Sequence, residues 1–169
     1  MTSRALTQGE RALARSIFGD ALDCAPVTVR RRRWFPFQPR GIVMAPTGHI
    51  HVHPAGEQWS EDYSREPLRL QALFLHELTH VWQSQTRGKY YLPLMRHPFC
   101  RYSYRLKPGR RFEDYGLEQQ AEIVRHLFLL RNGQDVPGAP SRTALEALVP
   151  FGGGDHQDRA NSSPPRPSG

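Results

Sequence analysis

Long hydrophobic runs are absent from this sequence. No apolar stretch in its 169 residues approaches the roughly 18–20 residues that a membrane-spanning helix needs. Residues 1–20 also lack the apolar core of a secretory signal peptide. We therefore expect a protein with no membrane span that is produced in the cytoplasm without a signal peptide, so that any export uses another route.

Cysteine and lysine are scarce. Cys24 and Cys100 can form at most one disulfide, and the sequence does not choose between a disulfide and free thiols. Lys89 and Lys107 are the only lysines, so arginine carries almost all of the basic charge behind the formal net charge of +7. The run from Arg30 to Arg33 is typical of a solvated or partner-facing strand. It lies in no recognised nucleic-acid-binding module, so we do not expect nucleic acid to be the partner.

Helical and strand-like patterns alternate along the chain. We expect one domain over residues 1–150 and a disordered tail over residues 151–169, where glycine, proline, serine and polar residues dominate. Apolar spacing predicts the helices Gln8–Leu22 (with a Thr7/Glu10 capping box), Leu68–Gln85 (with Gly88 as C-cap), Leu117–Arg131 and Ser141–Leu148. Strand-like runs lie at Val27–Trp34, Gly41–Ala45 and His49–His53, and Lys89–Asp114 is predicted to be irregular.

The predicted helix Leu68–Gln85 is apolar on almost every face, yet it contains His76, Glu77 and His80 in the pattern H-E-x-x-H. The two histidines are one helical turn apart, so their imidazoles can bind one tetrahedral Zn²⁺. Glu77 points beside the ion, where it can act as general base toward a metal-activated water. Burying these polar side chains is unfavourable unless something satisfies them. The pattern therefore predicts a catalytic zinc site.

Glu118 and Glu122 are candidates for completing that site. A catalytic zinc centre needs a third protein ligand, and these glutamates are one turn apart on the next long predicted helix. One of them would bind the metal, and the other would orient a ligand histidine. The residues themselves leave open which glutamate has which role.

The arrangement resembles the glutamate zincins (gluzincins), in which a downstream helix supplies a ligand glutamate followed four residues later by an acidic residue. The strings HELTHVWQ and YGLEQQAEI also resemble the metallopeptidase domain attached to some VgrG spike proteins of the bacterial type VI secretion system, and related Rhs/VgrG-associated proteins. The resemblance implies zinc on His76, His80 and Glu118, with Glu77 catalytic and Glu122 in contact with His76. It also implies an α+β, zincin-like fold whose small, partly antiparallel sheet packs on the two motif helices.

A biological setting is implied by the same resemblance. It is that of an antibacterial effector toxin that hydrolyses a protein or peptide substrate in the target-cell periplasm. Such an effector has a VgrG-type delivery partner and a cognate immunity protein. Two features depart from the pattern: this chain carries no spike domain, and the interval from His80 to Glu118 (118 − 80 = 38 residues) is longer than in thermolysin-like enzymes.

Several residues around the motifs are candidates for contact with a substrate. The candidates for stabilising the developing oxyanion are Tyr102, Tyr104, Tyr115 and His97. The predicted strand with His49, His51 and His53 is expected to be a histidine-lined edge strand near the cleft rather than a second metal site, since zincins pair an extended substrate with an edge strand.

Three other functions remain open from the sequence. A cytoplasmic housekeeping or regulatory metallopeptidase would share the chemistry but not the delivery. A non-catalytic binding module would use a closed structural metal site. A basic nucleic-acid-binding protein would use its arginines and would bind in a strongly salt-dependent way.

Overall fold

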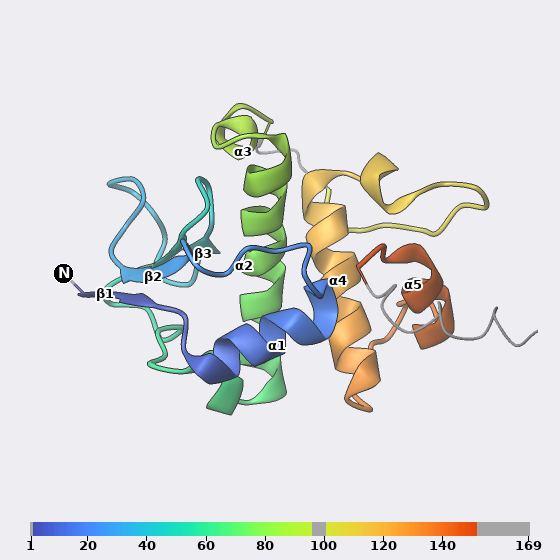
Figure 1. Ribbon diagram of the computed structural model, residues 1–169, viewed down its shortest axis with the longest axis horizontal. Coiled ribbons are helices and arrows are strands. Elements are labelled where there is room, and N and C mark those ends of the chain that lie inside the picture. Colours follow the sequence, from blue (N-terminus) through green and yellow to red (C-terminus); the bar gives the residue numbers. More distant parts are fainter. Residues whose placement is uncertain (1, 96–100, 152–169) are drawn as a thin grey trace, which may run out of the picture.

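Helix α2 (Leu68–Arg87) runs through the middle of the protein. The computed structural model describes residues 2–95 and 101–151, and in it the sheet lies on one side of α2 while α4 (Leu117–Arg131) lies on the other (Figure 1). Leu75, Leu78 and Val81 of α2 are completely buried, as expected for a helix that is apolar on almost every face. The architecture is α+β, as the sequence predicts.

A small mixed sheet of four strands, in the order β1-β2-β4-β3, packs against α2. Its strands are β1 (Thr2–Ala5), β2 (Thr28–Arg31), β3 (Val43–Met44) and β4 (Ile50–Val52). β2 and β4 are parallel, whereas the two outer pairs are antiparallel. Val29, Ile50 and Val52 belong to the same buried core as the apolar residues of α2. The sheet therefore forms one wall of the core against which the central helix is fixed.

The remaining helices are α1 (Gln8–Phe18), α3 (Tyr91–Met95) and α5 (Arg142–Leu148), with short 3-10 turns at Tyr63–Arg65 and Phe112–Asp114. α4 has the predicted bounds, and Gly88 follows the end of α2 as predicted. α1 ends before the predicted Leu22, because Gly19 adopts a left-handed φ of 54° that favours glycine. The three predicted strands are shorter than expected, β1 was not predicted, and α3 lies in a segment predicted to be irregular.

Buried Glu10 holds the N-terminal elements together. Its carboxylate accepts hydrogen bonds from two nitrogens of Arg4, at 2.7 and 2.8 Å, and from the backbone nitrogen of Tyr63 at 2.9 Å. The predicted capping box with Thr7 is present as well. A buried carboxylate with this many donors is well satisfied, so β1, α1 and the turn that precedes α2 are fixed to one another.

The packed part of the chain includes Phe151, a residue that the sequence analysis assigns to the tail. Its ring contacts Phe18, Trp82 and Phe112, with centroid distances of 5.1, 4.9 and 5.5 Å. The rest of the predicted tail, residues 152–169, lies outside the described residues, as does Cys100. In the part of the chain that the structure describes, no helix is both long and apolar enough to cross a bilayer.

The histidine-bearing strand β4 is internal to the sheet, so the prediction of an edge strand is wrong. β4 pairs with β2 on one side and with β3 on the other, and the short strand β3 forms that edge. The three histidines have separate contacts: His49 with Thr28, His51 with Trp34, and His53 with Arg33. The sequence could not reveal this, because the neighbours of a strand are set by pairing between distant segments.

His51 is fully buried on the face of β4 opposite the core. Ile50 and Val52 point toward the core, so the alternation of the strand directs His51 away from it, against the ring of Trp34 at a centroid distance of 5.3 Å. Burial, together with the nearby charges of Arg30 and Arg32, lowers the pKa of His51 to about 4. The folded protein therefore holds His51 as a neutral imidazole at neutral pH.

We predict that His51 makes the fold less stable in mild acid. Its ordinary pKa of 6.5 falls to about 4 on folding, so between these pH values the unfolded chain binds a proton that the folded protein does not bind. The free energy of unfolding should therefore fall as the pH is lowered from 6.5 to about 4, by at most about 3 kcal/mol. His51→Gln should remove this part of the pH dependence in urea unfolding at about pH 5 and pH 7.5, with chelator in every sample. An identical pH dependence in both proteins would contradict the prediction.

Candidate metal centre

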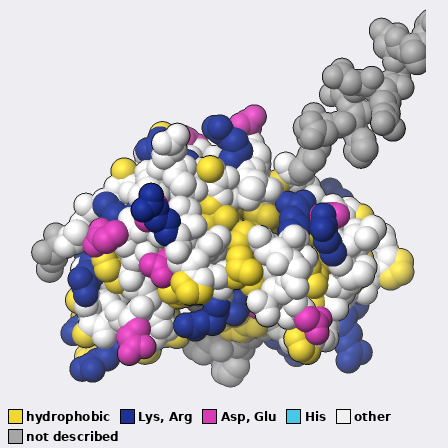
Figure 2. All heavy atoms as spheres, turned by 90° about the horizontal axis from the view of Figure 1, so that it is seen from below, with side chains coloured by type: hydrophobic (Ala, Val, Ile, Leu, Met, Phe, Trp, Pro, Cys, Tyr) yellow, Lys and Arg dark blue, Asp and Glu magenta, His cyan; other side chains and the backbone are white. Residues whose placement is uncertain are grey.

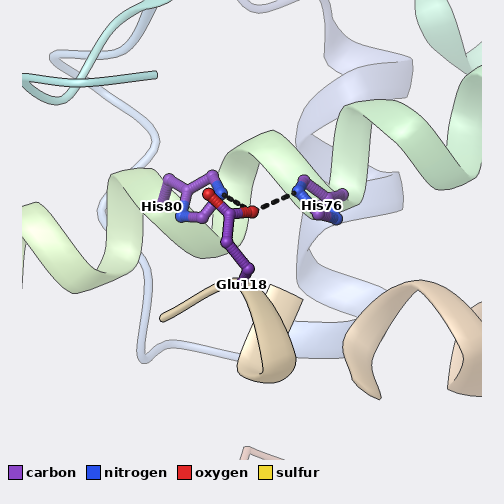
Figure 3. A group of neighbouring side chains, drawn as sticks. All are labelled: His76, His80 and Glu118. Atoms are coloured by element: carbon purple, nitrogen blue, oxygen red, sulfur yellow. Dashed lines mark ion pairs between the residues drawn. The ribbon is translucent and has the colours of Figure 1, made fainter. Parts of the chain in front are cut away.

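Two facing helices bring three polar side chains together in the protein interior. His76 and His80 lie one turn apart on α2, and Glu118 lies in the first turn of α4. Figure 3 shows the carboxylate of Glu118 between the two imidazoles. One of its oxygens, Oε2, lies 3.3 Å from Nε2 of His76 and 3.3 Å from Nε2 of His80. The residues that the sequence proposes as ligands therefore converge on one point.

This group has the composition and geometry of a metal site. One potential ligand atom from each of the three side chains lies within 4.8 Å of the others, and all three residues are buried. Nε2 of His80 makes no hydrogen bond within the described part of the chain, although it lies 3.3 Å from Oε2 of Glu118, and a buried nitrogen in this position is better satisfied by an ion held between the two groups. Two imidazoles and one carboxylate form a donor set that suits Zn²⁺, so these residues fit the ion that the sequence implies.

Gln83 fixes the orientation of His80. Its side-chain oxygen lies 2.9 Å from Nδ1 of His80, while its amide nitrogen donates to the backbone oxygen of Leu117 and to the side chain of Gln120. A hydrogen bond to Nδ1 leaves Nε2 as the nitrogen that faces Glu118, which is the arrangement that a histidine ligand requires. The same glutamine thereby links α2 to the start of α4.

Glu122 approaches His76 from the other side of the ring. Its Oε1 lies 3.0 Å from Nδ1 of His76 and 3.2 Å from a guanidinium nitrogen of Arg125, and its Oε2 lies 3.3 Å from Nε2 of His126. The hydroxyl of Tyr104 is 2.8 Å from Nδ1 of His126. Glu122 is therefore held by several partners and contacts His76 at Nδ1, the nitrogen that is not directed toward Glu118.

The electrostatics of the centre favour positive charge. Burial by itself would lower the pKa of His76, but the carboxylates of Glu118, Glu122 and Glu77 raise it to about 9. Burial would likewise raise the pKa of Glu122, but contacts with His126 and His76 and the charge of Arg125 hold it well below its usual range. A site that stabilises a protonated imidazole in this way is suited to hold a cation in place of that proton.

A pocket of about 360 Å³ opens beside His76, one of the three residues. It is lined by His76, Glu77 and Leu73 from α2, by Glu122 and Arg125 from α4, by the segment Gly41–Val43 that leads into β3, and by Tyr102. Glu77 is 3% exposed and is in the wall of this pocket. The pocket therefore adjoins the side chain that the sequence proposes as the general base.

The structure places the candidates for oxyanion stabilisation in different surroundings. Tyr102 lines the pocket and lies parallel to the ring of His76, at a centroid distance of 6.5 Å. The hydroxyl of Tyr104 bonds to His126, and that of Tyr115 accepts from the backbone nitrogen of Lys107. His97 lies outside the described residues. Among the described candidates, Tyr102 is the one whose position suits contact with a substrate.

Gln83 and His126 are components of the site that the sequence analysis missed. Each follows a motif residue at helical spacing: Gln83 is three residues after His80, and His126 is four residues after Glu122. That spacing places side chains on a common helix face and was the signal available. A polar residue on a helix is, however, more often solvated, and its partner is visible only once the opposite helix is in position.

The fold and the site together define a class of protein: an α+β domain with a buried His-His-Glu group at the junction of two helices. No protein-family model matches the chain. Its structure is similar to a solved structure, the effector domain of Pseudomonas aeruginosa VgrG2b, with a TM-score of 0.72 and 38% sequence identity over 88% of this chain and 84% of that one. The chain belongs to the family of this effector domain.

The full-length relative is much larger than this chain. The type VI secretion system spike protein VgrG2b of P. aeruginosa is 42% identical over 150 residues, which cover 83% of this chain. The chain spans only 14% of the length of that curated relative. The similarity therefore concerns the effector part of the spike protein.

Metal content should distinguish the roles of the two glutamates. We expect about one zinc per wild-type chain by plasma mass spectrometry, since three protein ligands suffice for a zinc centre. Glu118→Ala should lose the metal, whereas Glu122→Ala should lower zinc affinity by about 10- to 100-fold, the usual effect of removing a group that orients a ligand. Glu113→Ala, which changes an exposed glutamate, is the matched control. Loss of zinc mainly in Glu122→Ala would exchange the two assignments.

Removing the contact between His126 and Glu122 should have a smaller effect on zinc affinity than removing Glu122 itself. His126→Phe keeps the size of the ring but removes the contacts with Glu122 and Tyr104. Since Arg125 and His76 still hold Glu122, zinc affinity in competition with a chromogenic chelator should fall, but by less than in Glu122→Ala. Unchanged affinity in His126→Phe would show that the contact with His126 does not help to position the carboxylate.

Proposed function

We propose that the protein is a zinc-dependent metallopeptidase that hydrolyses peptide bonds. The observation that carries the proposal is that His76, His80 and Glu118 converge in the interior while Glu77, one residue after the first histidine, lines an adjoining pocket. A purely structural metal site would be enclosed by its ligands. Here a pocket with room for a substrate adjoins the group, which supports a catalytic role.

In this proposal each side chain has a defined role. His76, His80 and Glu118 would hold Zn²⁺, which when bound supplies Lewis acidity toward the scissile carbonyl and the attacking water. Glu77 accepts the proton of that water on its carboxylate and returns it to the leaving amine. Glu122 keeps Nδ1 of His76 protonated, so that Nε2 stays directed toward the centre, and Tyr102 donates a hydrogen bond to the developing oxyanion.

The family membership supports a role as a type VI secretion effector. VgrG2b is a spike protein of that system, and the domain to which this chain is related is its effector domain. By that relation we propose a VgrG-type delivery partner, delivery to the periplasm of a target cell, and a cognate immunity protein. Toxicity on export to the periplasm, but not on retention in the cytoplasm, would support this role against a cytoplasmic housekeeping or regulatory peptidase.

Binding of nucleic acid is a weaker candidate. On the face that Figure 2 shows, basic side chains are interspersed with acidic ones instead of forming a continuous stripe. A protein that tracks a phosphate backbone needs such a stripe or groove. The buried histidine–glutamate group would also have no part in that function, whereas peptide hydrolysis uses every member of it.

Glu77→Gln should separate catalysis from metal binding. The amide has almost the size of the carboxylate but cannot accept the proton, so turnover should fall by at least about 100-fold while the zinc content stays near one per chain. The measurement is hydrolysis of a quenched fluorescent peptide library, with metal content determined on the same samples. Glu57→Gln, a substitution in the loop after β4, serves as the matched control.

Two results would contradict the proposal. Full activity in Glu77→Gln would remove the assigned general base. Failure of a hydroxamate, a zinc-directed inhibitor, to affect the zinc-loaded wild type would indicate a closed structural metal site.

A further inference from the structure

The loop between β2 and β3, residues 32–42, exposes a group of large apolar side chains. We call it the aromatic loop. Phe37 is 88% exposed, and Trp34, Phe35 and Ile42 are between 39% and 43% exposed. In Figure 1 the loop rises from the sheet toward the same side of the view as α3. Scattered apolar residues are normal on a protein surface, but several on one projecting loop indicate an interaction site.

The aromatic loop has a defined shape. Buried Gln38 accepts a hydrogen bond from the backbone nitrogen of Trp34 at 2.7 Å and donates one to the backbone oxygen of Ile42 at 2.7 Å, which closes the loop across its base. Arg33 is bonded to His53 and to the backbone oxygen of Pro36. These contacts hold the loop in a defined conformation. The exposure of Phe37 is a property of that conformation and does not reflect a lack of contacts within the loop.

The chain segment that contains the loop is basic and has no acidic residue. Between Asp23 and Glu57 the chain contains no aspartate or glutamate, but it contains Arg30 to Arg33 and Arg40. Arg32 and Arg40 are exposed and lie at either end of the aromatic loop. A partner for this surface must therefore accept apolar side chains and carry negative charge.

We propose that the aromatic loop binds the surface of a bilayer that contains anionic lipid. Trp and Phe side chains insert favourably at the level of the headgroups, and arginines beside them bind the lipid phosphates. A projecting, convex tip suits a soft bilayer, since a protein partner would need a matching pocket to receive Phe37. Aromatic side chains and arginine also occur in single-strand nucleic-acid sites, but those use a groove that follows the backbone, and this loop is a projection.

The aromatic loop also forms part of the candidate active site. Gly41 and Ile42, at its end, line the pocket beside His76 and Glu77. Binding of the loop to lipid therefore brings the mouth of that pocket close to the bilayer surface. Peptide segments of membrane-associated proteins would then be presented to the pocket at high local concentration. The lipid binding itself does not rest on the proposed peptidase activity.

Flotation with large unilamellar vesicles tests the proposal on the full chain. The vesicles are phosphatidylcholine alone or phosphatidylcholine with about one third phosphatidylglycerol, at near-physiological salt. Wild-type protein and Glu77→Gln should both float with the anionic vesicles and remain unbound with the zwitterionic ones. Because the inactive variant is included, lipid binding is measured independently of catalysis.

Matched variants separate the apolar and the charged contributions. Phe37→Ser should weaken binding to anionic vesicles about tenfold, whereas Leu94→Ser, which changes a similarly exposed residue of α3, should not. Arg32→Ser with Arg40→Ser should weaken it about fivefold for each arginine. Arg69→Ser with Arg105→Ser removes the same charge from exposed positions outside the loop and should have little effect. Circular dichroism on every variant checks that the fold is retained.

Three outcomes would overturn the proposal. The first is failure of the wild type to bind anionic vesicles. The second is equal weakening by the loop variants and their controls, which would indicate attraction by overall charge alone. The third is tighter binding to a single-stranded oligonucleotide than to anionic vesicles at the same salt, with the same dependence on Phe37, which would assign the loop to nucleic acid instead.

Discussion

The pairing of α2 with α4 is the constraint on which the rest of the structure depends. Each helix buries polar side chains in a contact that is otherwise apolar, and those side chains face each other: His80 and Gln83 on one helix, Glu118 and Gln120 on the other. A shift of one helix by a turn would leave buried carboxylates and amides without partners, at a penalty of several kcal/mol in all. The polar groups therefore fix the register, and the apolar residues supply the attraction.

The same interface would couple folding to the proposed metal binding. The proposed ligand atoms come from two helices that touch directly, so a bound cation would also hold those helices together, and its binding free energy would add to the stability of the fold. The sheet and the Arg4–Glu10 pair contribute from outside this interface: β4 packs against α2, and Glu10 is bonded to the turn that precedes α2. Chemistry and stability are thus concentrated in one pair of helices.

The sequence predicted those helices well and the sheet poorly, for a physical reason. α4 could be bounded from apolar spacing because helical hydrogen bonds are local. β3 and β4 are short, and their partners lie far away in the chain, so neither the inner position of β4 nor the existence of β1 was visible. His76, Glu77 and His80 could be predicted as site candidates because their spacing is typical of a metal-binding helix. The roles of Gln83 and His126 depend on which side chains the other helix brings opposite them.

The aromatic loop and the packed helices contribute different parts of the candidate site. The proposed metal ligands and the proposed general base lie on helices packed into the core, whereas the wall of the pocket comes partly from a surface loop whose base is closed by Gln38. Surface loops accept changes of length and composition more readily than packed helices do. Within one family, a lineage could therefore change what the domain contacts by exchanging this loop while the two packed helices stay the same, so that partner choice and the buried centre are free to evolve separately.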